Sequence, residues 1–223
     1  MKKKSILKII VDVIMIILML LEYSKIYTGQ LIHELCGVIL LILFITHNIL
    51  NISFYKSLFK GKYNINRIIM TIINIGFLLC MLLTIILGIP ISSYLFKFLK
   101  LDGNMTTRKL HTILGYWGLI FLSFHLGLHF KMIFSKISNK TKNNVILRIA
   151  TCFIQVLIII YGIKLMIDNN LGDYLIGKSS FAIPNGDIIN SFVNYFIIVF
   201  SIGLVVYNLE KLFIKHSKKR KEV

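Results

Sequence analysis

Six nearly apolar stretches of about 20 residues constrain this chain more than any other feature, because a helix of about that length crosses the hydrocarbon core of a membrane. Inside that core every backbone N–H and C=O has to be hydrogen-bonded within the protein, so a long apolar segment folds as a helix. The sequence therefore predicts an all-α integral membrane protein. Its six transmembrane helices are expected at residues 5–24, 31–51, 67–89, 110–130, 145–167 and 189–209.

The distribution of charge orients these helices and argues against a nucleic-acid-binding protein. The 223 residues are 57% hydrophobic and carry a formal net charge of +17. The basic residues lie between the apolar runs, which is typical of membrane topology, and the positive-inside rule then places both termini in the cytoplasm. Of the 26 lysines and arginines, those left on the outer flanks are Lys25, Lys97, Lys100, Arg108, Lys109, Lys164 and Lys178.

Five of the six histidines fall in two predicted spans: His33 and His47 in the second, and His111, His125 and His129 in the fourth. An ionisable residue inside a span is costly and usually functional. Two pairs, His33/His47 and His111/His125, have the same spacing of fourteen residues, which puts both members within about 40° on one helix face, about 21 Å apart along the axis. Both spans run from outside to inside. His33 can therefore face His111 near the outer surface, and His47 can face His125 deeper in.

Two opposed imidazoles at each level suit a haem better than a bare metal ion. Zinc usually takes four tetrahedral ligands, whereas haem iron needs only axial ligands, which facing helices can supply. Gly37 and Gly115 each follow the outer histidine of their helix by four residues, which leaves room for a flat ring. No CxxCH motif is present for thioether attachment. The predicted axial ligands of two non-covalent b-type haems are His33, His111, His47 and His125.

The motif H-x3-G-x9-H occurs twice and defines an internal repeat. Each copy lies on the second helix of a hairpin, so two repeated hairpins could form a four-helix bundle with the haems between its second and fourth helices. The predicted organisation is a di-haem cytochrome b-like bundle over residues 1–134, an additional two-helix transmembrane hairpin over 135–210 and a basic cytoplasmic tail over 211–223.

Two residues near the predicted ligands have more than one interpretation. His129 lies about 6 Å deeper than His125 along the helix. It could replace His125 as a ligand, although His47 offers no partner at that depth, or it could bind a propionate, a quinone or a neighbouring helix. Arg108, at the outer end of the same helix, fits either a haem propionate or an ordinary interfacial anchor.

Two acids and two long connections also have no single assignment. Asp12 and Glu22, in the first span, could serve proton or quinone chemistry or could simply reach the interface. The connections at 90–107 and 168–188 fit plain surface loops or partner contacts. The first of them also has the Tyr/Leu/Phe pattern of a short interfacial helix.

The segments LIHELCGVILLILFITHNILN and RKLHTILGYWGLIFLSFHLGLHF resemble the paired-histidine helices of the membrane di-haem cytochrome b superfamily. Within it, residues 5–134 are most similar to the bacterial flavinylation-associated cytochrome family. The resemblance implies electron transfer across the plasma membrane, with the four paired histidines as axial ligands. It also implies an extracytosolic partner with covalently attached flavin, and flavin is expected only on that partner because no NAD- or FAD-binding domain follows the spans.

The leading hypothesis is a di-haem electron conduit in the bacterial plasma membrane, an electron-transfer component rather than a stand-alone catalyst. One alternative is a quinol-oxidising or ferric-reducing membrane subunit. Another is a metal or proton transporter that uses the histidines without haem. The expected partners are a flavin-carrying or other redox protein, quinone and membrane lipid.

Overall fold

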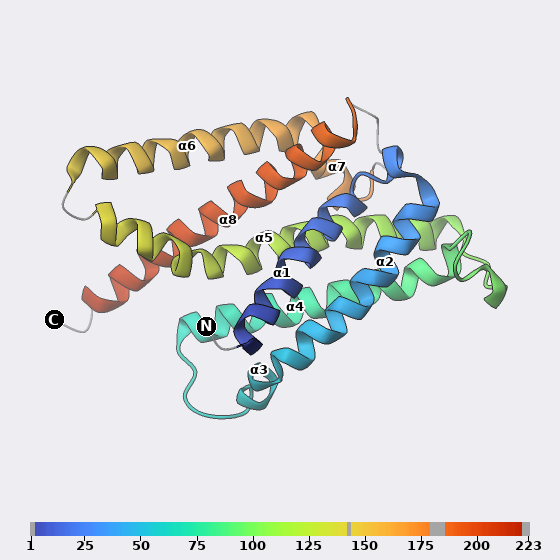
Figure 1. The fold of residues 1–223 in the computed structure, drawn as a ribbon, viewed down its shortest axis with the longest axis horizontal. Coiled ribbons are helices and arrows are strands. Elements are labelled where there is room, and N and C mark those ends of the chain that lie inside the picture. Colours follow the sequence, from blue (N-terminus) through green and yellow to red (C-terminus); the bar gives the residue numbers. More distant parts are fainter. Residues whose placement is uncertain (1–2, 142–143, 179–185, 220–223) are drawn as a thin grey trace. The chain divides into compact units, whose positions relative to one another are not determined.

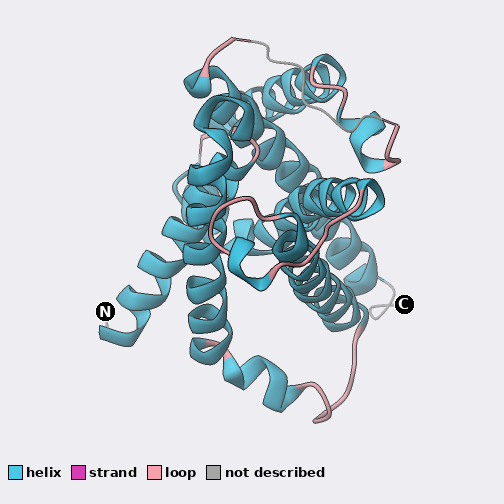
Figure 2. Cartoon of the chain, turned by 90° about the vertical axis from the view of Figure 1, so that its right-hand side faces the viewer, coloured by secondary structure: helices cyan, strands magenta, loops and turns pink. Residues whose placement is uncertain are grey.

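Helices make up most of the chain in the computed structural model, which describes residues 3–141, 144–178 and 186–219 (Figure 1). No strand occurs among these residues (Figure 2), so the all-α class predicted from the sequence is confirmed. The α-helices are α1 Lys3–Glu22, α2 Lys25–Leu50, α3 Ile52–Ser57, α4 Ile65–Gly88, α5 Met105–Thr141, α6 Val145–Asp168, α7 Leu171–Leu175 and α8 Ile188–Lys219. Two single-turn 3-10 helices, η1 Ile89–Ile91 and η2 Lys97–Leu99, lie between α4 and α5.

Five helical segments of the described chain are long and apolar enough to cross a membrane, consistent with a multi-pass membrane protein. They correspond to the second to sixth predicted spans and cover Lys25–Leu50, Ile65–Ile91, Met105–Lys131, Val145–Asp168 and Ile188–Phe213. Helix α6 has the least buried apolar stretch of the five: only 6% of it is buried within the protein. Ile146 and Ile167, near its two ends, are 78% and 70% exposed. So large an apolar surface is suited to lipid or a protein partner.

The first predicted span differs from the other five. Residues 5–22 are helical in α1, as expected, but they contain Lys8, Asp12 and Glu22. Charged side chains are costly in hydrocarbon, and α1 is therefore not among the five candidate spans. Its role as a sixth span stays a prediction.

The chain divides into two compact units. The first comprises residues 1–63, 82–112 and 179–195, and the second comprises residues 64–81, 113–178 and 196–223. In the first unit α1 packs beside α2 (Figure 1), with Leu20 and Phe44 among the buried side chains. The helical path of α2 breaks at Gly29, where φ is 81° and ψ is 169°. Glycine adopts such a backbone without steric cost, so the predicted span beginning at residue 31 starts after this kink.

The connection between α4 and α5 folds around the carboxylate of Glu34. This side chain of α2 is 9% exposed. It accepts hydrogen bonds from Ser92 Oγ at 2.7 Å and from the backbone N–H groups of Ser93, Tyr94 and Leu95 at 2.7, 3.1 and 2.8 Å. A carboxylate with several donors is a strong local anchor. The connection is therefore an ordered loop held against the N-terminal half of α2, and its helical content is limited to η1 and η2.

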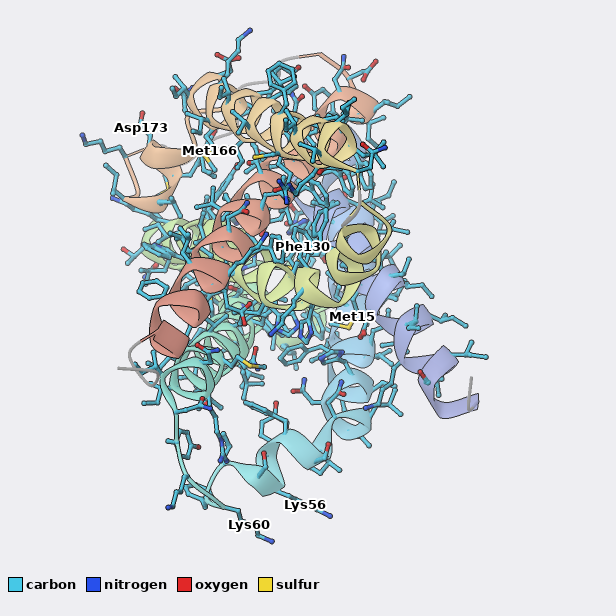
Figure 3. All side chains as sticks on the ribbon, turned by 90° about the vertical axis from the view of Figure 1, so that its left-hand side faces the viewer. Met15, Lys56, Lys60, Phe130, Met166 and Asp173 are labelled. Carbon is cyan, nitrogen blue, oxygen red and sulfur yellow. The ribbon has the colours of Figure 1, made fainter. Side chains whose placement is uncertain are left out.

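The core of the second unit forms where α5 meets α8. Leu119 and Leu204 are fully buried there. A Cβ atom on Gly127 of α5 would lie 2.7 Å from the carbonyl oxygen of Gly203 of α8, so the two backbones approach closely. Phe130 packs against Gly203 and lies among the helices (Figure 3). Small residues at such crossings let helices pack tightly without a hydrophobic driving force.

Alanine at Gly127 is expected to destabilise the protein, because its methyl group would collide with the Gly203 backbone. Overpacking of this kind costs about 1–3 kcal/mol. Thermal unfolding of the purified protein in detergent, followed by circular dichroism, measures the loss. Gly172→Ala is the matched control, since a Cβ at Gly172 meets nothing within 4 Å. Equal melting temperatures for the two variants would contradict the close crossing.

Candidate functional site

The structure brings His33 and His111 together in the first unit. His33 lies on α2 and His111 on α5, with their ring centroids 6.1 Å apart and their ring planes at 84°. With metal–nitrogen bonds of about 2 Å and about 1 Å from each nitrogen to its ring centre, two imidazoles on opposite sides of one metal have centroids about 6 Å apart. The observed separation matches that arrangement.

An acceptor on the preceding helix holds the Nδ1 atom of each histidine in this pair. His33 Nδ1 forms an ion pair with Glu22 Oε2 of α1. The Nδ1–H group of His111 donates to the carbonyl oxygen of Thr84 of α4 at 2.9 Å, and Gly88 leaves room for the His111 ring. Because a carbonyl oxygen only accepts, His111 carries its proton on Nδ1 and has a lone pair on Nε2. Ligation of a metal through Nε2 requires this tautomer.

His47 and His125 each have an oxygen atom at Nδ1 as well, and each contact lies within one unit. His47 Nδ1 lies 2.7 Å from Asp12 Oδ1 of α1, and His125 Nδ1 lies 2.9 Å from Asn74 Oδ1 of α4. Asn51 Nδ2 also approaches His47 Nε2 at 3.4 Å. All four histidines of the repeated motif therefore have an oxygen atom close to Nδ1, through an ion pair at His33 and a hydrogen bond at each of the other three.

The acceptors themselves follow the internal repeat. Asp12 and Glu22 are 10 residues apart (22 − 12), and so are Asn74 and Thr84 (84 − 74). In each hairpin the first helix supplies two acceptors and the second supplies two histidines. The repeat defined by H-x3-G-x9-H thus extends to the helix before each motif. The sequence left the roles of both acids open and did not single out Asn74 or Thr84.

Charged side chains of both signs surround the His33–His111 pair. Oε1 of Glu22 is buried and has no hydrogen-bond partner in the described part of the chain. Lys25, at the start of α2, lies within electrostatic range of Glu22, Arg108 and His111. Arg108, in the first turn of α5, also lines a surface pocket. These two cations are suited to pair with carboxylates such as haem propionates, and Lys25 was not singled out from the sequence.

The two glycines of the motif have different surroundings. A Cβ on Gly115 would meet nothing within 4 Å, so the surface of α5 is open there. A Cβ on Gly37 would lie 3.9 Å from Glu22 Oε1. Gly115 therefore leaves space that a planar ligand could use, whereas Gly37 lies against the carboxylate that holds His33.

His125 and His129 differ in position on α5. His125 is half-buried, with Asn74 at its Nδ1. The ring of His129 is exposed and contacts the His125 ring at a centroid distance of 4.8 Å. His125 therefore has an oxygen atom at Nδ1, and the exposed His129 ring lies beside it.

The aromatic residues that follow Gly115 pack against α7. Tyr116 stacks on Tyr174 with ring centroids 4.3 Å apart, and Trp117 Nε1 donates to the carbonyl oxygen of Leu175 at 3.2 Å. These contacts attach the start of the 168–188 connection to α5. Both residues therefore have a packing role in the second unit.

The His33–His111 pair offers two imidazoles as possible ligands. Within residues 3–141, 144–178 and 186–219, no three His, Cys, Asp or Glu side chains come together as they would around a metal ion. Haem iron needs only axial ligands from the protein. Two imidazoles with acceptors at Nδ1 meet that requirement at the His33–His111 pair.

Comparison with known proteins gives no assignment. No protein-family model, curated protein or solved structure matches this chain. The functional argument therefore depends on the histidines, their acceptors and the internal repeat.

Proposed function

We propose that the protein is a transmembrane b-type di-haem cytochrome that moves electrons across the plasma membrane. One observation carries the proposal: all four histidines of the repeated motif have Nδ1 at an acceptor on the preceding helix. Metal-binding histidines in proteins almost always have such a second partner, which fixes the tautomer and the ring orientation. The 6.1 Å separation of the His33 and His111 rings supports the same function.

Each haem is assigned a pair of Nε2 atoms from facing helices. The proposed pairs are His33 with His111, which lie in one unit, and His47 with His125, which are paired by their matched spacing in the sequence. When bound, haem iron supplies a one-electron step between its ferric and ferrous forms. The protein orients the imidazoles through their Nδ1 partners, and Lys25 and Arg108 pair with propionates at the His33–His111 site.

In this proposal α1 is the sixth span, with both termini in the cytoplasm. Its Asp12 and Glu22 are paired with histidines of α2, which lowers the cost of placing charged groups in the membrane. Lys56 and Lys60 are exposed at and after the end of α3 (Figure 3), which suits a cytoplasmic connection. Six spans return the chain to the side where it began.

The proposed redox partner is an extracytosolic protein with covalently attached flavin. The support is the resemblance of residues 5–134 to the flavinylation-associated cytochromes of bacteria. The same resemblance suggests the bacterial plasma membrane as the location.

A dithionite-reduced minus oxidised spectrum of the purified protein tests the proposal. We expect b-type haem bands, and a haemochrome assay should give two haems per chain. Expression has to be supported by sufficient haem. If b-type bands are absent under those conditions, the protein is not a haem cytochrome.

A further inference from the structure

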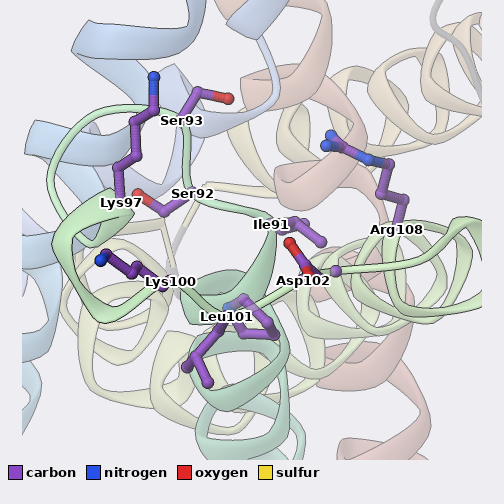
Figure 4. Close-up of a pocket in the computed structure, with 10 residues that line it drawn as sticks. Ile91, Ser92, Ser93, Lys97, Lys100, Leu101, Asp102 and Arg108 are labelled. Atoms are coloured by element: carbon purple, nitrogen blue, oxygen red, sulfur yellow. The ribbon is translucent and has the colours of Figure 1, made fainter.

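A pocket of about 520 Å³ lies on the connection between α4 and α5 in the first unit. Lys97 and Lys100 line it from the loop, and Arg108 lines it from the first turn of α5 (Figure 4). Ser92 and Asp102 contribute to the wall. Three cations and a single acid therefore surround one concave space.

The positive charge of this pocket is not balanced within the described chain. No ion pair of Lys97, Lys100 or Arg108 occurs among the residues that the structure describes. Asp102 is the only acid in the lining, and it is exposed. A concentration of one sign of charge in a concave site attracts ligands of the opposite sign. The ligand that fits is an anion.

The loop that carries the two lysines is held in place before any ligand binds. Glu34 anchors its first half through Ser92 and three backbone N–H groups, and Ser92 Oγ in turn accepts a hydrogen bond from Phe96 N–H at 2.9 Å. At the other end, Asn104 Oδ1 accepts a hydrogen bond from Thr107 N–H at 2.8 Å and so caps α5. A preorganised loop reduces the entropy lost on binding.

The position of the pocket identifies the source of the anion. It lies on the connection between Ile65–Ile91 and Met105–Lys131, two segments that are long and apolar enough to cross a membrane. Large apolar side chains of the same loop are exposed beside the lysines, including Tyr94 at 57%, Phe98 at 73% and Leu101 at 54%. Apolar and aromatic residues next to cations are typical of surfaces that sit in the membrane interface. A small anion free in water would not require these side chains.

We propose that this pocket binds the phosphate headgroup of an anionic phospholipid. Lys97 and Lys100 contact the phosphate, and the exposed apolar side chains of the loop lie against the acyl chains. By the positive-inside rule these cations are on the side of the membrane where such residues are scarce, and lipid binding gives them a role there. This proposal does not depend on haem binding, because its test measures the amount of lipid bound to the protein.

The test measures lipid retained by the purified full-length protein in detergent, using native mass spectrometry after addition of phosphatidylglycerol or phosphatidylcholine. Each cation near a membrane surface contributes about fivefold to affinity for anionic lipid, so Lys97→Gln/Lys100→Gln is expected to weaken phosphatidylglycerol retention about 25-fold. Arg108 is kept, because the proposed haem site also uses it. Lys109→Gln/Lys178→Gln is the matched control: it removes two exposed cations outside the pocket and should leave retention unchanged.

Asp102→Asn is a third variant, and it is expected to change lipid retention in the opposite direction. Removing the only acid of the lining should strengthen phosphatidylglycerol retention about threefold, the scale of one exposed charge pair. Three results would overturn the proposal: equal losses in the two double variants, equal retention of phosphatidylcholine, or displacement of the lipid by millimolar inorganic phosphate. The last would identify the pocket as a site for free phosphate.

Discussion

Substitution of His111 by alanine is expected to lower the haem content from two per chain to one. The Nε2 of His111 is the proposed axial ligand opposite His33, and a haem held by one imidazole alone loses half of its protein ligation. The backbone should be little disturbed, because His111 lies within α5 and alanine is a strong helix former. A haemochrome assay against protein concentration measures the ratio.

His125 and His129 provide the paired comparison. His125→Ala is expected to remove the other haem, whereas His129→Ala should leave two haems per chain, because Asn74 orients His125 and the His129 ring is exposed. Both variants change the same residue type one helical turn apart on α5, so they share any general effect on folding. If His129→Ala loses a haem and His125→Ala does not, the assignment of the inner ligand is reversed.

Replacing Glu22 by glutamine is expected to raise the reduction potential of the haem at His33 by about 60 mV, a tenfold shift in a one-electron equilibrium. The carboxylate at His33 Nδ1 makes the imidazole a stronger electron donor and adds a negative charge, and both favour ferric iron. Glutamine keeps the size of the side chain and an oxygen that can accept the hydrogen bond. Spectroelectrochemical titration of the purified protein gives the two midpoint potentials.

Asp12→Asn is the matched control for Glu22→Gln. Asp12 is bound to His47, so its substitution should shift the potential of the other haem in the same direction. Each variant is thus expected to move one midpoint and leave the second nearly unchanged. A uniform shift of both potentials in either variant would show that the acids act through general charge and not through their histidines.

The helices could largely be predicted from hydropathy, because an apolar run of sufficient length has few alternatives. The ends of the helices could not. Predicted span 110–130 is part of α5 Met105–Thr141, since polar residues extend a helix beyond the membrane without changing its apolar length. In α1, Asp12 and Glu22 interrupt the apolar run, so its place as a sixth span stays a prediction.

For the candidate site, the spacing of residues along single helices predicted the histidines but not the groups that contact them. The positions of His33 and His111 follow from matched periodicity, and the structure brings the two rings together. Their acceptors depend on how one helix packs against the next, and Thr84 acts through its backbone carbonyl, which no side-chain pattern can reveal. The anchor formed by Glu34 depends in the same way on a loop about 60 residues further along the chain.

The pairing of α1 acids with α2 histidines also bears on how the protein enters the membrane. The partners of Asp12 and Glu22 are synthesised after α1 itself, on the helix that follows. While α1 is alone at the translocation machinery, its acids have no neutralising partner and its partition into lipid is unfavourable. Once α2 emerges, the two helices can leave the translocon together as one hairpin with their polar groups joined. In the proposed six-span topology we therefore expect the first hairpin to insert in one concerted step, with the histidines contributing before any cofactor arrives.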